Sequence, residues 1–508
     1  MRMRPPFGAL LATALAAVAL APSSSAAQRI APLPKPCHLD GVEMARLPAR
    51  IPASLAVSIF ASDSTDAAGE LAGGIADAIA SRLGRSVPRL LVIGRRAQRR
   101  LVVVDSITAR AMADSLGATY VLAGRVSDGM RGRTVGFTLY NGVTGRAMIY
   151  RTLPHDSAHV MLVEQNVSSQ VATQILGKLK PAEQRAIDRV PDVSPKAYDS
   201  FVRGHGARDV WSFARAAGYF REAARLDRSF APAYAELALA DAEILQRGVN
   251  STVGADLIFE VRSASSHAIA LDSTSSLSWR AEAQSRMVQG RPAAMWRRAF
   301  ERAIALDARD PAAFEDYGLA LIRTGDREAG RPQLERALAL EPGRAQPIAA
   351  LAGLAMLDHR DASACSLLNE AIVGDVLFAP AWAQRAVVRA RHGDLRFAWA
   401  DAETATQLGE GHLGESAGAM VDLIARDTSR ARDRLNSEWT LVKQAGAVGV
   451  LDGTSIARAL LAAGQSTRAL DVLELATPRG PWLLAALRDP AFDTIRNDQR
   501  FRAITARQ

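Results

Sequence analysis

The sequence predicts an α+β chain of two domains, a small α/β domain followed by an all-α superhelical solenoid. One pattern returns every 34 residues, because Asp307, Glu341, Asp375 and Gly409 each close an apolar segment. Residues 51–180 instead alternate between β-rich and helix-periodic runs. The 508 residues are too many for one hydrophobic core, and 48% hydrophobic with 23% charged residues is the composition of a folded globular protein.

Residues 1–27 have the pattern of a secretory signal peptide. Two arginines precede an apolar run from Phe7 to Ala21, and small residues stand before Gln28. The run of 15 residues is shorter than the roughly 20 that a membrane-spanning helix needs. We therefore expect cleavage before Gln28, an exported, periplasmic or envelope-associated protein, and no transmembrane span in the mature chain. An uncleaved anchor is the alternative.

Residues 28–50 form a Pro-rich lead that contains Cys37, and the only other cysteine is Cys365 in a predicted repeat helix. An exported protein can join two such residues in a disulfide. Nothing in the sequence brings the lead next to that helix, so we expect the thiols to stay unpaired and Cys365 to be a small buried residue. Cys37 follows Lys-Pro rather than small apolar residues, which argues against a lipoprotein anchor.

Residues 51–180 are predicted to form the small α/β domain. Strands are expected at 54–60, 88–93, 119–124, 134–140 and 146–152, with further β character at 101–104. Helices are expected at 68–83, 106–116 and 158–179, the second capped by Asp105 or Ser106 and ended by Gly117. In the first helix four aliphatic residues share one face: Leu71, Ile75, Ile79 and Leu83.

This order of elements resembles the small α/β domain at the start of TolB-like and FlgO-like bacterial envelope proteins. The residues that carry the resemblance are the first strand, Ala-Asp-Ala-Ile-Ala at 76–80, the run from Leu116 to Gly124, and the hairpin with Phe-Thr-Leu-Tyr at 137–140 and Thr-Gly at 144–145. The usual Pro-Phe pair is replaced by Phe60-Ala61. The resemblance implies an envelope protein in which such a domain precedes helical repeats.

The basic residues are concentrated in this first part of the chain. Residues 28–193 hold 21 Lys plus Arg against 14 Asp plus Glu, whereas residues 194–508 hold 39 of each. The densest cluster, at Arg95, Arg96, Arg99 and Arg100, has no aromatic residue to stack on bases, so we expect no nucleic-acid partner. It is either a solvated loop or a basic patch that docks on an envelope component such as anionic lipid, cell-wall polymer or an acidic protein.

Residues 181–196 are predicted to hold a helical end and a linker, and residues 197–478 the helical repeats. Each repeat has a helix, a short turn such as Gly325-Asp326, and a second helix, and it must stack on a neighbour to bury its apolar face. Asp227 and Asp272 are 45 residues apart, which predicts an extension around 248–255. Residues 479–508 are expected to cover the last helix pair.

The period and the placing of small and large residues resemble the tetratricopeptide repeat (TPR). Small residues stand at Gly318, Ala352 and Ala386, a large one at Trp382, and Glu341-Pro342 keeps the proline that ends a second helix. The resemblance implies a right-handed superhelix whose first helices line a peptide-binding groove. It implies binding, not chemistry.

The TPR resemblance also implies which side chains face the groove. They are mixed in character and lack the repeated Lys and Asn of a carboxylate clamp, so we expect an extended or helical peptide with apolar anchors, oriented by an arginine or left with solvated arginines. The expected groove residues are Glu315, Leu319, Ile322, Arg323, Gln346, Met356, Leu357, Val387 and Arg391.

The sequence offers little for catalysis or for a cofactor. There is no phosphate-binding loop, nucleophile elbow or Cys-x-x-Cys pair. His155 and His159 have a spacing that can bind zinc, but Asp156 stands where a metalloprotease has glutamate and no third ligand is evident. We predict a non-enzymatic scaffold without metal or cofactor that binds protein or peptide partners. The alternative is an exported metal-dependent hydrolase that uses both histidines.

Overall fold

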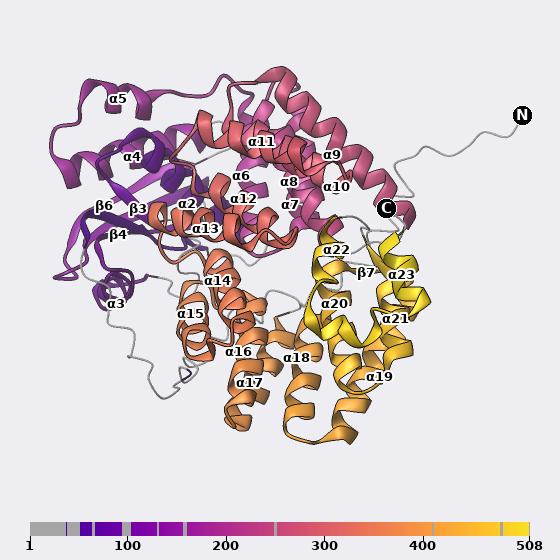
Figure 1. Ribbon diagram of the computed structural model, residues 1–508. Helices are drawn as coiled ribbons and strands as arrows, with labels where there is room; N and C mark the ends of the chain where they lie inside the picture. Colours follow the sequence, from indigo (N-terminus) through magenta and orange to yellow (C-terminus); the bar gives the residue numbers. More distant parts are fainter. Residues whose placement is uncertain are drawn as a thin grey trace, which may run out of the picture.

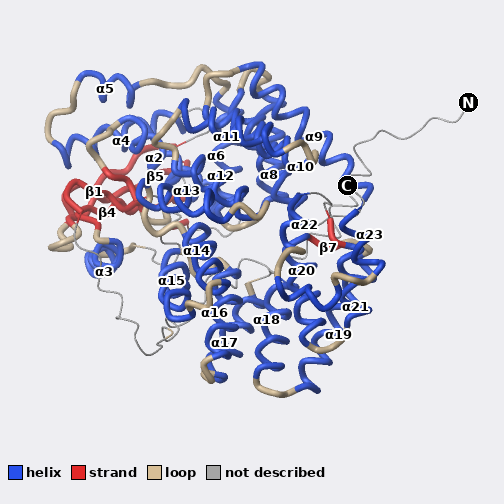
Figure 2. Tube along the Cα trace, viewed as in Figure 1, coloured by secondary structure: helices blue, strands red, loops and turns tan. Residues whose placement is uncertain are grey.

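The computed structural model describes residues 37, 51–62, 67–93, 103–129, 132–155, 160–247, 251–408, 411–477 and 481–506. Strands gather at one end of the molecule, apart from one short pair, and helices build the rest (Figures 1 and 2). The predicted fold class, a small α/β domain followed by an all-α solenoid, is therefore confirmed.

The α/β domain is built on one mixed sheet with the strand order β3-β1-β4-β5-β6, and β2 pairs with β4. β1 is parallel to β3 and β4, whereas β4, β5 and β6 form an antiparallel meander. The first strand begins earlier than predicted. The strands are β1 (Ile51–Val57), β2 (Ala61–Ser62), β3 (Leu91–Ile93), β4 (Ala118–Gly129), β5 (Gly132–Asn141) and β6 (Ala147–His155).

Successive side chains of a strand point to opposite faces, and this alternation places helices on both sides of the sheet. Leu55 and Val57 pack with α2 (Ala67–Ser86) and α4 (Val160–Leu176), and Ala56 packs with α3 (Ser106–Leu116). The predicted apolar face of α2 is fully buried. Asp105 caps α3 and Gly117 ends it at φ 63°, as the sequence predicts.

The stretch predicted as a linker contains α5 (Pro181–Asp188), which packs on α2 and α4. Arg89 holds Glu183 of this helix through two hydrogen bonds, of 2.9 and 2.7 Å. This side-chain bonding with Arg89 lowers the pKa of Glu183 to about 2.

The first helix of the array, α6 (Pro195–Asp209), packs directly on α2 of the α/β domain. Two glycines make this possible. A Cβ on Gly206 would lie 1.8 Å from the carbonyl oxygen of Glu70, and a Cβ on Gly74 would lie 1.9 Å from that of Val202. The two helix backbones therefore touch, and the two domains share one hydrophobic cluster.

The array then continues as stacked helix pairs. The starts of α12, α14 and α16 are 34 residues apart, as are those of α13, α15 and α17, which confirms the predicted period. The helices are α7 (Phe213–Leu226), α8 (Ala231–Arg247), α9 (Ser251–Leu271), α10 (Ser276–Val288), α11 (Ala293–Leu306), α12 (Pro311–Arg323), α13 (Arg327–Leu340), α14 (Ala345–Leu357), α15 (Asp361–Gly374), α16 (Ala379–Arg391) and α17 (Leu395–Gln407).

The end of the array curls back towards its beginning. α20 contacts α8, and α22 contacts α12 (Figure 1), so that α8–α12 and α20–α23 contribute to one hydrophobic cluster. The last elements pack on α20 and α21. The remaining elements are α18 (Gly411–Ile424), α19 (Thr428–Ala445), β7 (Val448–Gly449), α20 (Val450–Ala462), α21 (Ser466–Leu475), β8 (Ala476–Thr477), α22 (Pro481–Ala486), the 3-10 helix η2 (Pro490–Ile495) and α23 (Gln499–Ala506).

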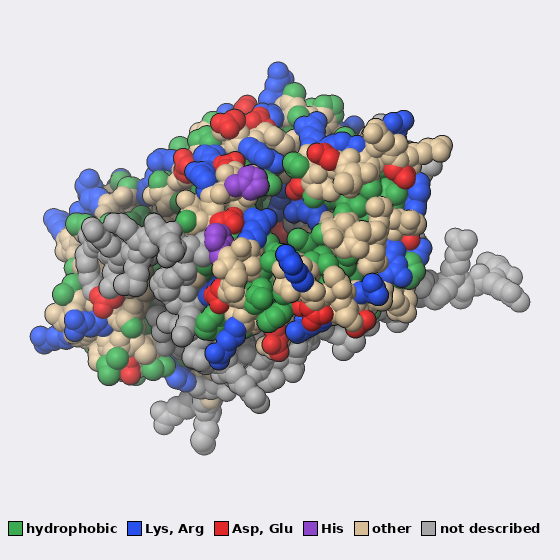
Figure 3. All heavy atoms as spheres, turned by 60° about the horizontal axis from the view of Figure 1, so that its bottom comes forward, with side chains coloured by type: hydrophobic (Ala, Val, Ile, Leu, Met, Phe, Trp, Pro, Cys, Tyr) green, Lys and Arg blue, Asp and Glu red, His purple; other side chains and the backbone are tan. Residues whose placement is uncertain are grey.

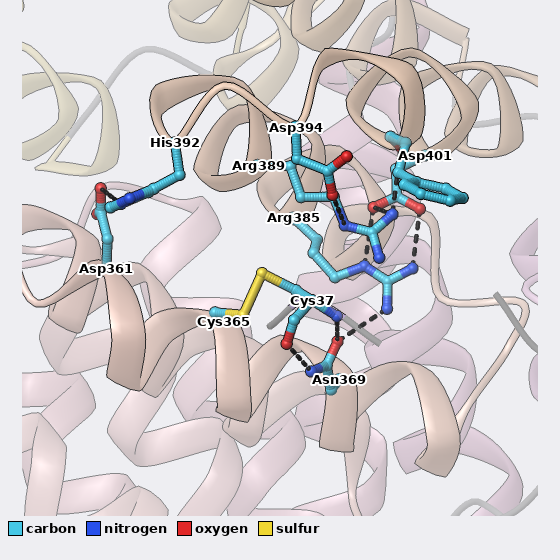
Figure 4. Close-up of a disulfide and its surroundings, with 10 residues drawn as sticks. Cys37, Asp361, Cys365, Asn369, Arg385, Arg389, His392, Asp394 and Asp401 are labelled. Carbon is cyan, nitrogen blue, oxygen red and sulfur yellow. Dashed lines mark hydrogen bonds and ion pairs between the residues drawn. A yellow bond between two sulfur atoms is a disulfide. The ribbon is translucent and has the colours of Figure 1, made fainter. Parts of the chain in front are cut away.

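Cys37 and Cys365 form a disulfide, so the prediction that they stay unpaired is wrong. Their Cα atoms are 5.8 Å apart although 328 positions separate them in the sequence. Asn369, one turn further along α15, accepts a hydrogen bond from the Cys37 amide and donates one to its carbonyl, both at 3.0 Å (Figure 4). This two-point hold on the Cys37 backbone depends on the folded array, and no local pattern of the lead encodes it.

Candidate functional site

The inner helices of successive repeats enclose a hollow of about 870 Å³, including its open mouth. Its lining comes from α6, α8, α10, α12 and α14, the first helices of five successive pairs, together with the turn after α6, the start of α7, Arg344 before α14 and Asp375 after α15. On the outer face drawn in Figure 3, acidic and basic side chains are interspersed rather than gathered by sign.

Ion pairs that cross between neighbouring inner helices form the polar part of the lining. Arg208 of α6 bonds Glu236 of α8, and Arg280 of α10 bonds Asp316 of α12 at 2.8 Å. Arg344, which precedes α14, bonds Glu315 of α12. Each pair spans two helices, so the charges fix the register of the stacked repeats.

Burial shapes the protonation of these groups. It raises the pKa of Asp316, although the nearby Arg280 guanidinium acts in the opposite direction. Burial also acts to lower the pKa of Arg280, but the carboxylates of Asp316 and Asp310 more than offset it, and that pKa lies above its ordinary value. The arginine therefore stays charged in the closely packed lining.

Two glutamines that line the hollow each have one amide atom without a hydrogen bond among the described residues. The Gln246 side chain is 6% exposed, and its Oε1 accepts a hydrogen bond from Arg323. Because a guanidinium can only donate, this contact orients the amide and leaves the buried Nε2 without a hydrogen bond. Gln284 is 7% exposed, and its buried Oε1 also has no hydrogen bond.

An aromatic edge closes one side of the hollow. Trp211 lies in the turn after α6 with φ 60°, in the left-handed region that a large side chain rarely adopts. Its ring contacts Phe378 at 5.2 Å and Phe213 at 5.9 Å between centroids. The strained turn is therefore held by aromatic packing at the mouth of the hollow.

The structure distributes the predicted groove residues among several environments. Glu315 and Gln346 line the hollow, and Arg323 lies behind Gln246. Leu319 and Ile322 instead pack with Leu334, Leu351 and Leu354 in a small apolar cluster.

The other predicted groove residues lie farther along the array. Met356 and Val387 pack against the cluster around the disulfide, and Leu357 is 40% exposed. Arg391 bonds Asp361 at 3.2 Å. The TPR resemblance assumed one facing pattern for every repeat, whereas only Glu315 and Gln346 of the nine expected groove residues line this hollow. One sequence signal would have indicated the arginines and glutamines of the hollow: they are polar residues at positions where the first helices of the repeats are otherwise apolar.

The remaining candidates lie in or beside the α/β domain. The basic run Arg95, Arg96, Arg99 and Arg100 lies outside the described residues, as does His159. His155 ends β6 and is 5% exposed. Among the described residues, no cluster of three or more His, Cys, Asp or Glu side chains could hold a metal ion. Within the same residues, no helix is long and apolar enough to cross a membrane.

The stacked helix pairs, their 34-residue period and the inner hollow define a TPR-like solenoid joined to an α/β domain. No protein-family model matches the chain, and no curated protein matches it in sequence.

Solved structures that align with the chain include Cut9 with Hcn1 from the APC/C, at 12% identity and a TM-score of 0.36, covering 69% of this chain and 82% of that one. Yeast Tom70 aligns at 14% identity and a TM-score of 0.35, covering 69% and 84%. Pseudomonas aeruginosa PilF aligns at 17% identity and a TM-score of 0.33, covering 42% of this chain and 91% of that one. Likenesses this distant say nothing about the partner of this chain.

Proposed function

We propose that this protein is a non-enzymatic scaffold or adaptor of the bacterial cell envelope, and that its hollow binds peptide or protein partners. The observation that carries the proposal is the hollow itself, where five successive inner helices provide one concave surface with buried polar groups. A concave surface built from stacked helix pairs suits extended or helical segments of a partner.

The chemistry of the lining supports binding over catalysis. Its arginines and carboxylates bond one another across helices, as Arg280 does with Asp316. Such pairs fix the register of the helices, and they do not present a nucleophile next to a base. We also propose that the protein needs no cofactor, because its sequence has no phosphate-binding loop, nucleophile elbow or Cys-x-x-Cys pair.

The proposed location in the envelope rests on the signal-like pattern of residues 1–27 and gains support from the disulfide. Structural disulfides form and persist in oxidising compartments such as the bacterial periplasm. We further propose that the α/β domain docks on another envelope component through the basic run at residues 95–100, in keeping with its resemblance to TolB-like proteins.

Site-specific photocrosslinking in intact cells tests the binding role. A photoreactive amino acid replaces Ala312, which lines the hollow, and in a matched control it replaces the exposed Glu335 on the outer helix α13. The proposal expects a discrete crosslinked partner from position 312 and none from position 335. Equal crosslinking from both positions, or none from position 312, contradicts it.

Metal analysis tests the alternative, an exported hydrolase that uses His155 and His159. Stoichiometric zinc in the purified protein, lost on His159→Ala, favours the hydrolase. Protein purified without bound metal removes it.

A further inference from the structure

The hollow carries more negative than positive groups. Among the residues that line it, four are carboxylates and three are arginines. Glu236, Asp310 and Glu341 bond these same arginines from behind the lining. Arg323, which bonds Gln246, adds a fourth guanidinium behind the lining, so seven carboxylates stand against four guanidiniums. The local field therefore favours a cationic occupant over an anionic one.

The two glutamines add a donor and an acceptor to this surface. Gln246 on α8 and Gln284 on the neighbouring helix α10 both line the hollow, and Gln246 Nε2 and Gln284 Oε1 are buried atoms without a hydrogen bond among the described residues. Leaving a buried polar atom without a partner is unfavourable, so a ligand that bonds both atoms gains on binding. A peptide unit has the matching groups, one carbonyl acceptor and one N–H donor.

We propose that the hollow binds the main chain of an extended segment that carries basic side chains. A carbonyl of the segment accepts a hydrogen bond from Gln246 Nε2, and an N–H donates to Gln284 Oε1. The lysine or arginine side chains of the segment meet the overall excess of carboxylates in and behind the lining. The inference rests on the proposed function and specifies the chemistry of the partner, which is basic in its side chains and recognised through its backbone.

Fluorescence anisotropy with labelled peptides tests the inference on the full chain. The probes alternate valine with lysine, with glutamate or with serine. The lysine peptide is expected to bind most tightly. Gln246→Leu and Gln284→Leu are each expected to weaken it about threefold to tenfold, the effect of one lost hydrogen bond. Gln384→Leu is the matched control, because Gln384 also has a buried amide oxygen without a partner but does not line the hollow.

A second measurement separates backbone recognition from a general effect of the substitutions. Methylation of alternate backbone nitrogens removes N–H donors from the lysine peptide. It should weaken binding to the natural protein and weaken binding to Gln284→Leu much less. The measurement on the natural protein remains informative if the variant folds poorly.

Three results overturn the inference. They are equal affinity for the lysine and glutamate peptides, equal loss in Gln384→Leu, or no effect of methylation on the natural protein. In each case, specific crosslinking from position 312 would leave the binding role intact. Failure of that crosslinking would instead remove the proposed function itself.

Discussion

The contact between α2 and α6 makes a prediction whose sign depends on the tertiary structure. In a solvent-exposed helix, replacing glycine by alanine stabilises a protein by about 0.5–1 kcal/mol, because alanine loses less backbone entropy on folding. At Gly206 the new Cβ would lie 1.8 Å from the Glu70 carbonyl oxygen. Neither backbone can turn aside, so the helices must separate. We expect Gly206→Ala to destabilise the protein by about 1–3 kcal/mol, the usual effect of overpacking.

Thermal or urea unfolding measures this effect, and Gly218→Ala provides the control. Gly218 lies on the exposed side of α7, and a Cβ added there would have no neighbouring atom within 4 Å, so alanine at this position should raise the stability. The rate of limited proteolysis between α5 and α6 reports on the contact between α2 and α6 itself. Loosening of this contact should speed cleavage in Gly206→Ala and not in Gly218→Ala. If both substitutions stabilise the protein equally, the two helices do not touch as described.

Further predictions concern the disulfide and two buried charges. Cys37→Ser, or reduction by dithiothreitol, should lower the unfolding temperature, because either change removes a link across 328 positions. The expected loss of unfolding free energy is roughly 2–5 kcal/mol. Dithiothreitol should have no further effect on the Cys37→Ser variant. Burial raises the pKa of Asp241 to about 8. Its contribution to stability is therefore present below about pH 4 and is lost as the pH rises to about 8. Asp241→Asn should flatten this part of a plot of unfolding free energy against pH, and an unchanged plot would show that Asp241 is not the titrating group. Asp401→Ala should destabilise the protein by about 3–5 kcal/mol, because it leaves Arg385 and Arg389, each 1% exposed, without their shared carboxylate. A loss of well below 1 kcal/mol in urea unfolding would show that solvent reaches these arginines.

The local parts of the fold were predictable because they depend on nearby residues. The aliphatic face of α2, the cap at Asp105 and the turn at Gly117 follow from helix periodicity and end signals. The period of the array was equally accessible, since every pair must bury the same face against its neighbour.

The hollow was predictable in its location but not in its composition. Glu315 and Gln346 line it, whereas Leu319 and Ile322 pack into a small apolar cluster of the array. Whether an inner-helix side chain faces the hollow depends on how far each pair is rotated against the next. The last helices of the array also fold back onto α8 and α12.

The sequence by itself determined which segments become helices or strands, and that the helices repeat, because period, caps and turns act over a few residues. Only the tertiary structure decided that Cys37 meets Cys365, that glycines let α2 and α6 touch, and that Gln246 and Gln284 share one hollow. These contacts join residues far apart in the chain. Their geometry depends on the summed rotations of many stacked helices, which no local pattern records.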